Sequence, residues 1–279
     1  MLPGGPIDCF WLMGNASSEP TFGYRVVAVQ HASPASSAGL IPFFDFILAA
    51  NDVTLDKFDA QLLPGIITNS LDQELYLKVL NVKSGTERDV VIVPTRKWGD
   101  SGNQESALGM TIRHESYFEA DEHVIHVVEV EADSPAALAG LIADKDYLLG
   151  TGETVFTDTD VLYDALNANI DKPVEFYVYN SESDEVRITV IMPNNQWGGE
   201  GILGASCAHG LLHKLPAECC RTNGIIHESL FTSSLNNSTV IEDNTTLYEK
   251  INATIQDGYN GSNPIDDQLS YETIKSTLM

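Results

Sequence analysis

The sequence predicts a mainly β protein with short helices (α+β), built from two copies of one domain and followed by an acidic tail. The segment Ser33–Leu40 recurs as Ser134–Leu141, and the similarity around it runs without gaps at an offset of 101 residues. It resumes at an offset of 99 where Trp98 corresponds to Trp197. A repeat of about 100 residues has the size of a domain, whereas solenoid units span about 20–50 residues.

The repeated segment predicts a very short helix with both ends specified. Ser33 and Ser134 are good N-caps, and the proline that follows each of them suits the first helical position. Gly39 and Gly140 then allow the left-handed conformation that ends a helix. We expect the leucine after each glycine to enter a core.

Apolar runs around this turn predict the other elements. In the first unit we expect strands at 24–29, 44–47, 75–82 and 90–94 and a helical segment over 58–70. Pro64 interrupts that segment, so the helix should begin or kink there. The second unit repeats the order, with strands at 124–130 and 145–148 and a clearer helix over 158–169.

These elements divide the chain into four parts. Residues 1–20 predict a leader with a possible internal start at Met13, residues 21–112 the first domain and residues 113–216 the second. Residues 217–279 are rich in Asn, Ser and Thr and have little periodicity, so we expect a disordered acidic tail.

Composition excludes several classes of function. The net charge of −25 disfavours nucleic acid and adhesion to anionic lipid. No run of 18 apolar residues predicts a membrane span, so membrane attachment needs a lipid chain or a protein partner. The four cysteines do not form a disulfide framework, which favours a reducing, cytosolic compartment.

Each unit resembles a PDZ domain, which binds an extended peptide as an added strand. The apolar-Gly loop that holds the peptide carboxylate in PDZ domains is missing before the capped turn, and two candidates end the units instead. The candidate peptide-binding residues are Leu108, Gly109, Met110, Thr111 and Ile112, followed by Leu203, Gly204, Ala205, Ser206 and Cys207. Each unit therefore resembles a circularly permuted PDZ domain whose binding strand comes last.

Two readings of these strands remain open, a peptide-binding strand and an ordinary core strand without a ligand. If the first holds, a bulky residue in place of Gly109 should block the approach of a peptide backbone while leaving the fold intact.

The tandem of permuted units resembles the Golgi reassembly stacking proteins, the GRASP family. The motifs that carry this resemblance are residues 42–47, 134–141, 177–180 and 197–201. The likeness implies a cytosolic, lipid-anchored, peripheral Golgi scaffold that self-associates, tethers membranes and acts in stacking and secretion. It implies golgin-like or cargo-tail peptides as partners, a homo-oligomer, the cytosolic face of the Golgi as location, and neither a cofactor nor nucleic acid.

The family resemblance also implies an N-terminal acyl chain. Residues 13–18 fit the Met-Gly-x-x-x-Ser pattern for N-myristoylation, which makes Gly14 the lipidation candidate if translation starts at Met13. A form that starts at Met1 lacks the acyl chain and is expected to be cytosolic.

The chain departs from the family at two places. The aromatic segment implicated in family self-association is replaced here by His209, Gly210, Leu211 and Leu212, which become the self-association candidates. The positions at which animal members share zinc with a partner carry Arg25 and Glu115, so we expect no metal site there.

Other chemistry is weaker. His209 and His213 have the spacing of metal ligands on a helix, but no third ligand is evident and surface histidines are the favoured reading. His123 and His126 have opposite parity in a strand. Ser206 lacks the second glycine of a nucleophile elbow.

We therefore expect no enzyme. The alternatives are a generic cytosolic tandem-PDZ adaptor and, with less support, the PDZ module of a protease. For the adjacent Cys219 and Cys220, surface thiols are favoured over acylation sites.

Overall fold

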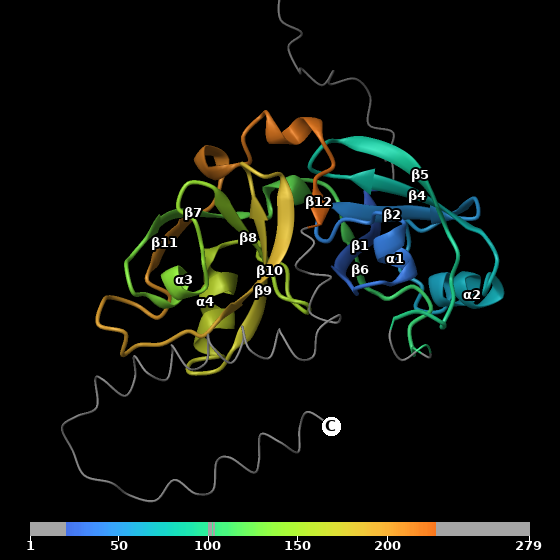
Figure 1. The fold of residues 1–279 in the computed structure, drawn as a ribbon. Coiled ribbons are helices and arrows are strands. Elements are labelled where there is room, and N and C mark those ends of the chain that lie inside the picture. The colour runs from blue at the N-terminus through green and yellow to red at the C-terminus, as the bar shows by residue number, and fades with distance from the viewer. Residues whose placement is uncertain (1–20, 100–101, 103, 227–279) are drawn as a thin grey trace, which may run out of the picture. The chain divides into compact units, whose positions relative to one another are not determined.

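The computed structural model describes residues 21–99, 102 and 104–226. These residues form two six-stranded sheets with a few short helices, which confirms the predicted mainly β class (Figure 1). No helix among them is both long enough and apolar enough to cross a membrane.

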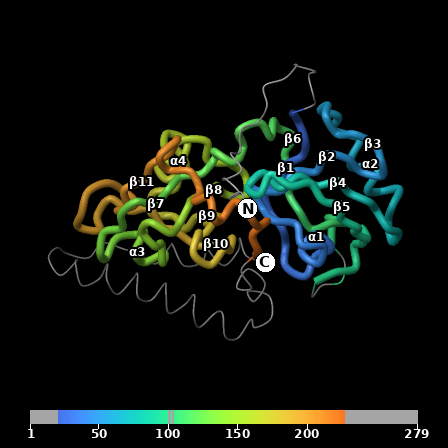
Figure 2. Tube along the Cα trace, turned by 90° about the horizontal axis from the view of Figure 1, so that it is seen from above, coloured from blue at the N-terminus to red at the C-terminus, as the bar shows by residue number. Residues whose placement is uncertain are grey.

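The first sheet has the order β5-β4-β2-β1-β6, and β3 pairs only with β2. Its strands are β1 (Phe22–Val29), β2 (Asp45–Ala50), β3 (Val53–Thr54), β4 (Leu75–Asn81), β5 (Thr86–Ile92) and β6 (Met110–Ser116). All of these pairs are antiparallel, and Figure 2 shows β6 beside β1.

The second sheet has the order β11-β7-β8-β9-β10-β12. Its strands are β7 (Ile125–Val130), β8 (Asp146–Gly150), β9 (Val174–Asn180), β10 (Glu185–Ile191), β11 (Ala205–Ala208) and β12 (Ile225–Ile226). Among the described strands of this sheet, only β12 pairs in parallel, with β10. The last long strand of each repeat, β6 or β11, therefore lies next to the first.

The helices are short. They are α1 (Pro34–Ser37), α2 (Leu62–Asn69), α3 (Pro135–Leu138) and α4 (Thr159–Asn167), with 3-10 turns η1 (Ala120–Glu122), η2 (Leu211–His213) and η3 (Cys219–Arg221). Asp158 caps α4 by accepting two backbone N–H groups. Pro64 lies in the first turn of α2, where its missing N–H removes no helical bond.

The repeated turn has the predicted geometry in both copies. The hydroxyl of Ser33 accepts the N–H of Ser36 at 3.1 Å, and Ser134 accepts the N–H of Ala137 at the same distance. Gly39 has a φ of 69° and Gly140 one of 72°. Both following leucines are buried.

A buried carboxylate fixes each turn to its sheet. Asp45 accepts the N–H of Ile41 at 2.7 Å and a guanidinium N–H of Arg88 at 3.0 Å. Arg88 also donates to the carbonyl of Gly39 at 3.1 Å. Asp146 and Arg187 repeat the arrangement in the second unit. The recurring aspartate thus connects the turn with β2 and β5 in the first domain and with β8 and β10 in the second.

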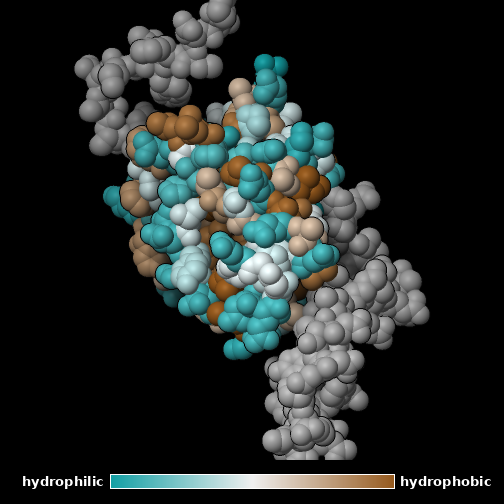
Figure 3. Space-filling view, turned by 90° about the vertical axis from the view of Figure 1, so that its left-hand side faces the viewer, coloured by the Kyte–Doolittle hydropathy of each residue, from teal (hydrophilic) through white to brown (hydrophobic). Residues whose placement is uncertain are grey.

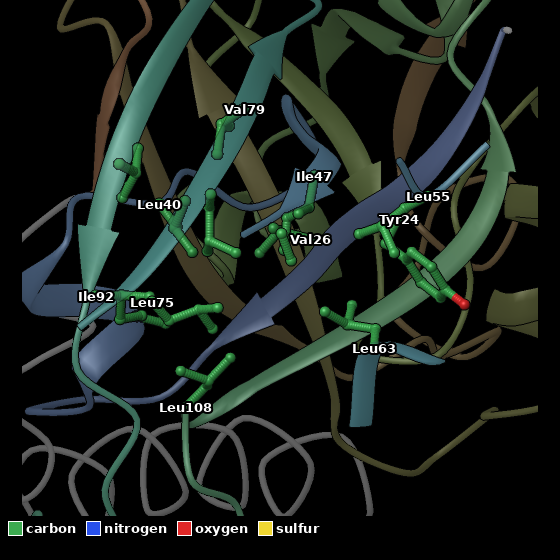
Figure 4. Close-up of a cluster of buried hydrophobic side chains, with 14 of the residues drawn as sticks. Tyr24, Val26, Leu40, Ile47, Leu55, Leu63, Leu75, Val79, Ile92 and Leu108 are labelled. Atoms are coloured by element: carbon green, nitrogen blue, oxygen red, sulfur yellow. The ribbon is translucent and has the colours of Figure 1, made fainter. Parts of the chain in front are cut away.

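Each sheet has its own hydrophobic core. In the first, side chains from four strands surround Val26 and Ile47, with Leu63 of α2 closing one side (Figure 4). In the second, Phe156 and Phe176 pack edge to face with centroids 5.1 Å apart. Burial at roughly 25 cal/mol per Å² of apolar surface is the main stabilising contribution in both.

A third buried cluster joins residues of both sheets. The ring of Phe43 lies 5.1 Å from that of Tyr177, and Phe44 lies 5.2 Å from Tyr179, centroid to centroid. Aromatic pairs of this kind contribute about 0.5–1.5 kcal/mol beyond their buried area. A shared core therefore connects the two domains in addition to the linker.

Lys83 is buried beside this cluster. Its Nζ donates to Asp184 at 2.7 Å and to the carbonyl of Cys219 at 2.6 Å, and it contacts Thr222 at 3.3 Å. A buried ammonium requires such partners because its desolvation costs several kcal/mol. Residues 219–222 thus contribute to the junction between the domains.

The structure differs from the sequence expectations at four points. The helix α2 begins at Leu62, later than the helical segment expected over 58–70, and β5 begins at Thr86, earlier than the strand expected at 90–94. The expected domain boundary at residue 112 falls inside β6. Residues 217–226, assigned to a disordered tail, form η3 and β12.

Candidate functional site

β6 is the outermost strand on its side of the first sheet and pairs only with β1 among the described strands. The carbonyl of Val26 accepts the N–H of Phe43 at 2.7 Å, so the backbone of Val26 is directed away from β6. Its register partner Ile112 is then a non-hydrogen-bonded partner, whose N–H and C=O point to the free edge. These groups are those that an added strand needs.

β11 repeats this geometry at the edge of the second sheet. The carbonyl of Val127 accepts the N–H of Asp144 at 2.8 Å, and the register partner of Val127 is Cys207. The backbone groups of Cys207 therefore face the free edge. Burial raises the pKa of the Cys207 thiol to about 11, so the side chain stays protonated and is a poor nucleophile.

The capped turns hold the two apolar-Gly loops. The carbonyl of Leu108 accepts the N–H of Ala35 at 3.0 Å, and the carbonyl of Leu203 accepts that of Ala136 at 2.9 Å. Both donors lie in the first turn of a short helix, where N–H groups lack intrahelical partners. The repeated segment thus positions the candidate loop in each domain.

Gly109 is packed too tightly for any side chain. It has a φ of 66°, and a Cβ there would lie 2.3 Å from the Cβ of Ser33 and 2.8 Å from the ring of Trp98. Gly204 meets Ser134 and Trp197 in the same way. The expectation that a bulky residue at Gly109 leaves the fold intact is therefore wrong, because it would displace the indole and the N-cap.

The loops differ in one hydrogen bond. The N–H of Gly109 donates to the hydroxyl of Ser106 at 2.9 Å, which occupies a donor that a peptide carboxylate needs. The residue three positions before Gly204 is Gly201, which has no hydroxyl. Trp98 and Trp197 donate from Nε1 to the carbonyls of Ser106 and Gly201, so these residues are structurally equivalent.

Half-buried apolar side chains of both α2 and β6 pack on the first core. They are Leu62, Ile66 and Ile67 of α2 and Met110 and Ile112 of β6. Farther along β6, the His114 ring contacts Phe22, Tyr24 and Phe58 at centroid distances of 5.0–5.7 Å. Sequence reasoning missed this aromatic group, because its members come from three separate segments.

Arg25 and Glu115, where the sequence predicted no metal site, meet as an ion pair. Arg25 is only 1% exposed, and its Nε lies 2.8 Å from a carboxylate oxygen of Glu115. Its guanidinium also lies 4.8 Å from the Phe46 ring centroid. Burial lowers the pKa of Arg25 to about 10, Glu115 opposes this shift, and the group stays charged at neutral pH.

The histidines have other partners than their sequence spacing suggested. His213 contacts His126, with their Nδ1 atoms 3.2 Å apart, and His123 lies 3.4 Å from Arg25. In the part of the chain that the structure describes, no three His, Cys, Asp or Glu side chains cluster closely enough to hold a metal ion.

The self-association candidates include the two most exposed large hydrophobic side chains described. Leu211 is 80% exposed and Leu212 is 93% exposed. On the face of the molecule in Figure 3, hydrophobic side chains form separate patches between polar ones.

The structure describes the cysteines considered for acylation, Cys219 and Cys220, but not the myristoylation candidate Gly14. The surface-thiol reading is wrong for Cys219, which is buried with its Sγ 3.3 Å from the carbonyl of Ser181, while Cys220 is half-buried. Gly14 lies outside the described residues.

The chain matches the profile of the GRASP55/65 PDZ-like domain twice, over residues 11–104 and 100–218. It is 37% identical over 208 residues to Golgi reassembly-stacking protein 1 of Mus musculus, covering 74% of this chain and 45% of the relative. An uncharacterised protein of Schizosaccharomyces pombe is 32% identical over 200 residues, covering 72% and 55%.

GRASP65 homolog protein 1 of Saccharomyces cerevisiae is 28% identical over 229 residues, covering 71% of this chain and 59% of the relative. The chain thus spans about half the length of the curated relatives it matches. The two profile matches together cover well over half of the chain, and the second match includes β6, which completes the first sheet. The chain therefore belongs to the GRASP55/65 PDZ-like domain family.

Proposed function

We propose that this protein is a peripheral scaffold of the Golgi that binds partner peptides at its strand edges and self-associates. The observation that carries this proposal is the double match to the GRASP profile, together with a free strand edge in each domain. The names of the mammalian relatives refer to Golgi reassembly and stacking. A scaffold uses binding surfaces and no catalytic group.

Peptide binding is assigned to the β6 edge. Ile112 offers outward N–H and C=O groups, and the half-buried side chains of α2 and β6 supply apolar contacts next to them. Main-chain bonds then give affinity, and alternate side chains of the peptide give specificity. Golgin-like or cargo-tail peptides are the proposed ligands.

Self-association is assigned to residues 209–212. Burying one leucine side chain contributes about 1.5–3 kcal/mol, so Leu211 and Leu212 together can drive a contact with a second copy. Leu211 and Leu212 directly follow β11, which supports a contact close to the second candidate edge. A homo-oligomer formed in this way tethers the membranes to which its members are attached.

Membrane attachment is assigned to an acyl chain on Gly14 together with a partner. The net charge of −25 opposes docking to an anionic cytosolic leaflet. One myristoyl chain binds membranes only marginally, with an association constant of about 10⁴ M⁻¹. A membrane-bound partner at the strand edges supplies the second contact, and avidity follows from the two together.

The test uses proline to remove a single edge N–H. Ile112→Pro should abolish binding of a partner peptide, and Ile112→Ala, which keeps the N–H, should weaken it by less than about tenfold. Asp89 on β5 is the matched control. The carbonyl of Tyr76 on β4 accepts the N–H of Asn51, so the backbone groups of Tyr76 point away from β5. Lys78, two residues further along β4, points the same way, and its register partner is Asp89. The Asp89 N–H therefore faces the outer edge of β5, at the opposite side of the sheet from β6.

Binding is measured by calorimetry, and the fold of each variant is checked by circular dichroism. Asp89→Pro should bind like the wild type. Equal binding by folded Ile112→Pro would exclude strand addition at β6.

A further inference from the structure

Two imidazole rings face each other in the second domain. His126 of β7 and His213 of η2 lie 87 residues apart in the chain, and their Nδ1 atoms are 3.2 Å apart. Each Nδ1 carries a lone pair unless it is protonated, so the two lone pairs converge on the space between the rings.

The equivalent position in the first domain carries a side chain that is paired within the protein. His126 corresponds to Arg25 at the repeat offset of 101, and Tyr147 under His126 corresponds to Phe46 under Arg25. Arg25 pairs with the opposite charge of Glu115 at 2.8 Å. His126 instead faces a second base, His213, and the opposite charge near it is the carboxylate of Asp144.

We propose that His126 and His213 bind a divalent transition-metal ion of the zinc class through their Nδ1 atoms. Zinc binds imidazole nitrogen at about 2.0–2.1 Å, and tetrahedral geometry then sets two ligand nitrogens about 3.3 Å apart. The observed separation of 3.2 Å matches that edge. Solvent completes the coordination, because these two rings are the protein ligands.

Both rings are held in place before any ion arrives. His126 stacks on Tyr147 with centroids 4.7 Å apart and an angle of 13° between the ring planes. His213 is followed by Lys214, whose Nζ pairs with Glu122 and whose carbonyl lies 3.5 Å from the Tyr147 hydroxyl. Ligands held in advance lose little conformational freedom on binding.

The surroundings also favour a cation. The chain carries 40 acidic and 15 basic residues, which attracts cations to its surface. Imidazole suits zinc, nickel and copper, whereas magnesium and calcium prefer oxygen ligands. The site should therefore bind copper more tightly than nickel or zinc and should not bind magnesium.

A metal ion here also has a structural effect. It joins η2, which carries Leu211 and Leu212, to β7 of the sheet. Zinc should therefore raise the melting temperature of the full chain. A hydrogen bond between the two rings without metal is the competing explanation of the short contact.

The experiment titrates zinc chloride into the full chain at neutral pH by calorimetry. The wild type should bind zinc saturably. His213→Ala and His126→Gln should each lower the affinity by at least about tenfold, since losing even an outer-shell partner of a metal costs about 10–100-fold. Each should also abolish the zinc-dependent rise in melting temperature.

The controls are His209→Ala, an exposed histidine four residues before His213, and Cys220→Ser, a half-buried thiol. Both should keep wild-type zinc affinity. His213 is half-buried in a short turn, so its variant tests the site even if His126→Gln disturbs β7. Wild-type affinity in folded His213→Ala, or no saturable binding by the wild type, overturns the proposal.

Discussion

Ser106 is the residue that distinguishes the first candidate loop from the second. Its hydroxyl accepts the N–H of Gly109. In the second loop the equivalent residue is Gly201, which has no hydroxyl to accept the N–H of Gly204. A peptide with a free carboxylate must displace this hydroxyl, whereas an internal peptide segment need not. The first domain should therefore favour internal segments.

Ser106→Ala should strengthen binding of a hydrophobic C-terminal peptide to the first domain. A net hydrogen bond is worth about 1 kcal/mol, so the gain should be about fivefold. The same peptide with an amidated C-terminus should show no gain. Fluorescence anisotropy with both peptides measures the difference, and equal gains for both would show that Ser106 does not compete with a carboxylate.

Asp184 gives the junction between the domains a defined pH dependence. Its burial raises the pKa of the carboxyl group, but hydrogen bonds from Lys83, Thr222 and Tyr179 outweigh burial and lower that pKa overall. Because the folded pKa lies below the unfolded one, the stabilisation is present above the unfolded value of about 3.9. It is lost as the pH falls through the folded value.

Urea unfolding of the wild type and of Asp184→Asn measures this contribution. The difference in unfolding free energy should stay constant from about pH 7 to about pH 5 and shrink below about pH 4. A difference that shrinks already near pH 6 would assign the effect to another group.

At the scale of elements, the sequence predicted what local chemistry determines. Ser33, Gly39 and their repeats specify a capped turn within a few residues, and the structure has it twice. The repeat also identified β6 and β11 as the last strands of their units. The start of β5 was missed because Thr86 to Asp89 form an exposed, charged strand segment without an apolar signal.

Contacts between distant segments were beyond sequence reasoning. The aromatic group around His114, the pairing of His126 with His213 and the burial of Lys83 each need contacts between residues at least 56 positions apart. Tertiary packing decides such contacts. The ordered structure of residues 217–226 was missed for the same reason, because their composition is typical of disorder. Nothing in their pattern shows that Lys83 needs their carbonyl and hydroxyl groups.

The carboxylate that fixes each turn predicts a large cost for its removal. Asp146→Asn keeps the shape but leaves Arg187, which is mostly buried, without an opposite charge. Breaking such a pair costs about 3 kcal/mol. Urea unfolding should show this loss, and adding Arg187→Met should recover part of it.

The exposed pair Lys78–Asp89 is the control for this comparison. Lys78→Met should change the unfolding free energy by less than about 1 kcal/mol. Equal costs for Asp146→Asn and Lys78→Met would show that the buried network does not hold the turn.

At the scale of the whole molecule, the two domains depend on residues after the second sheet's last long strand. A chain that ends at Ile226 keeps all three partners of Lys83, whereas a chain that ends at Glu218 keeps only Asp184. Each lost bond to a charged group costs about 1.5–3 kcal/mol. The shorter chain should therefore melt roughly 10 °C lower.

Lys83→Met supplies the internal control, measured by thermal unfolding in both truncated chains. Without the buried charge, much of the gap between the two melting temperatures should close. A gap of the same size would place the stabilising contact of residues 219–226 elsewhere.

The pairing of Phe22 with Ser116 has a mechanical consequence. The chain enters β1 at Phe22 and leaves β6 at Ser116, so both ends of the first domain lie at the same end of one ladder. Tension between the segment before Phe22 and the second domain acts first on the bond from the N–H of Tyr117 to the carbonyl of Thr21. The hydrogen bonds of the β1–β6 ladder then break one after another, beginning at the pair Phe22–Ser116. β6, the strand to which we assign peptide binding, is thus the first to separate from its sheet under load, and we expect a partner bound at its edge to be released when the chain is pulled.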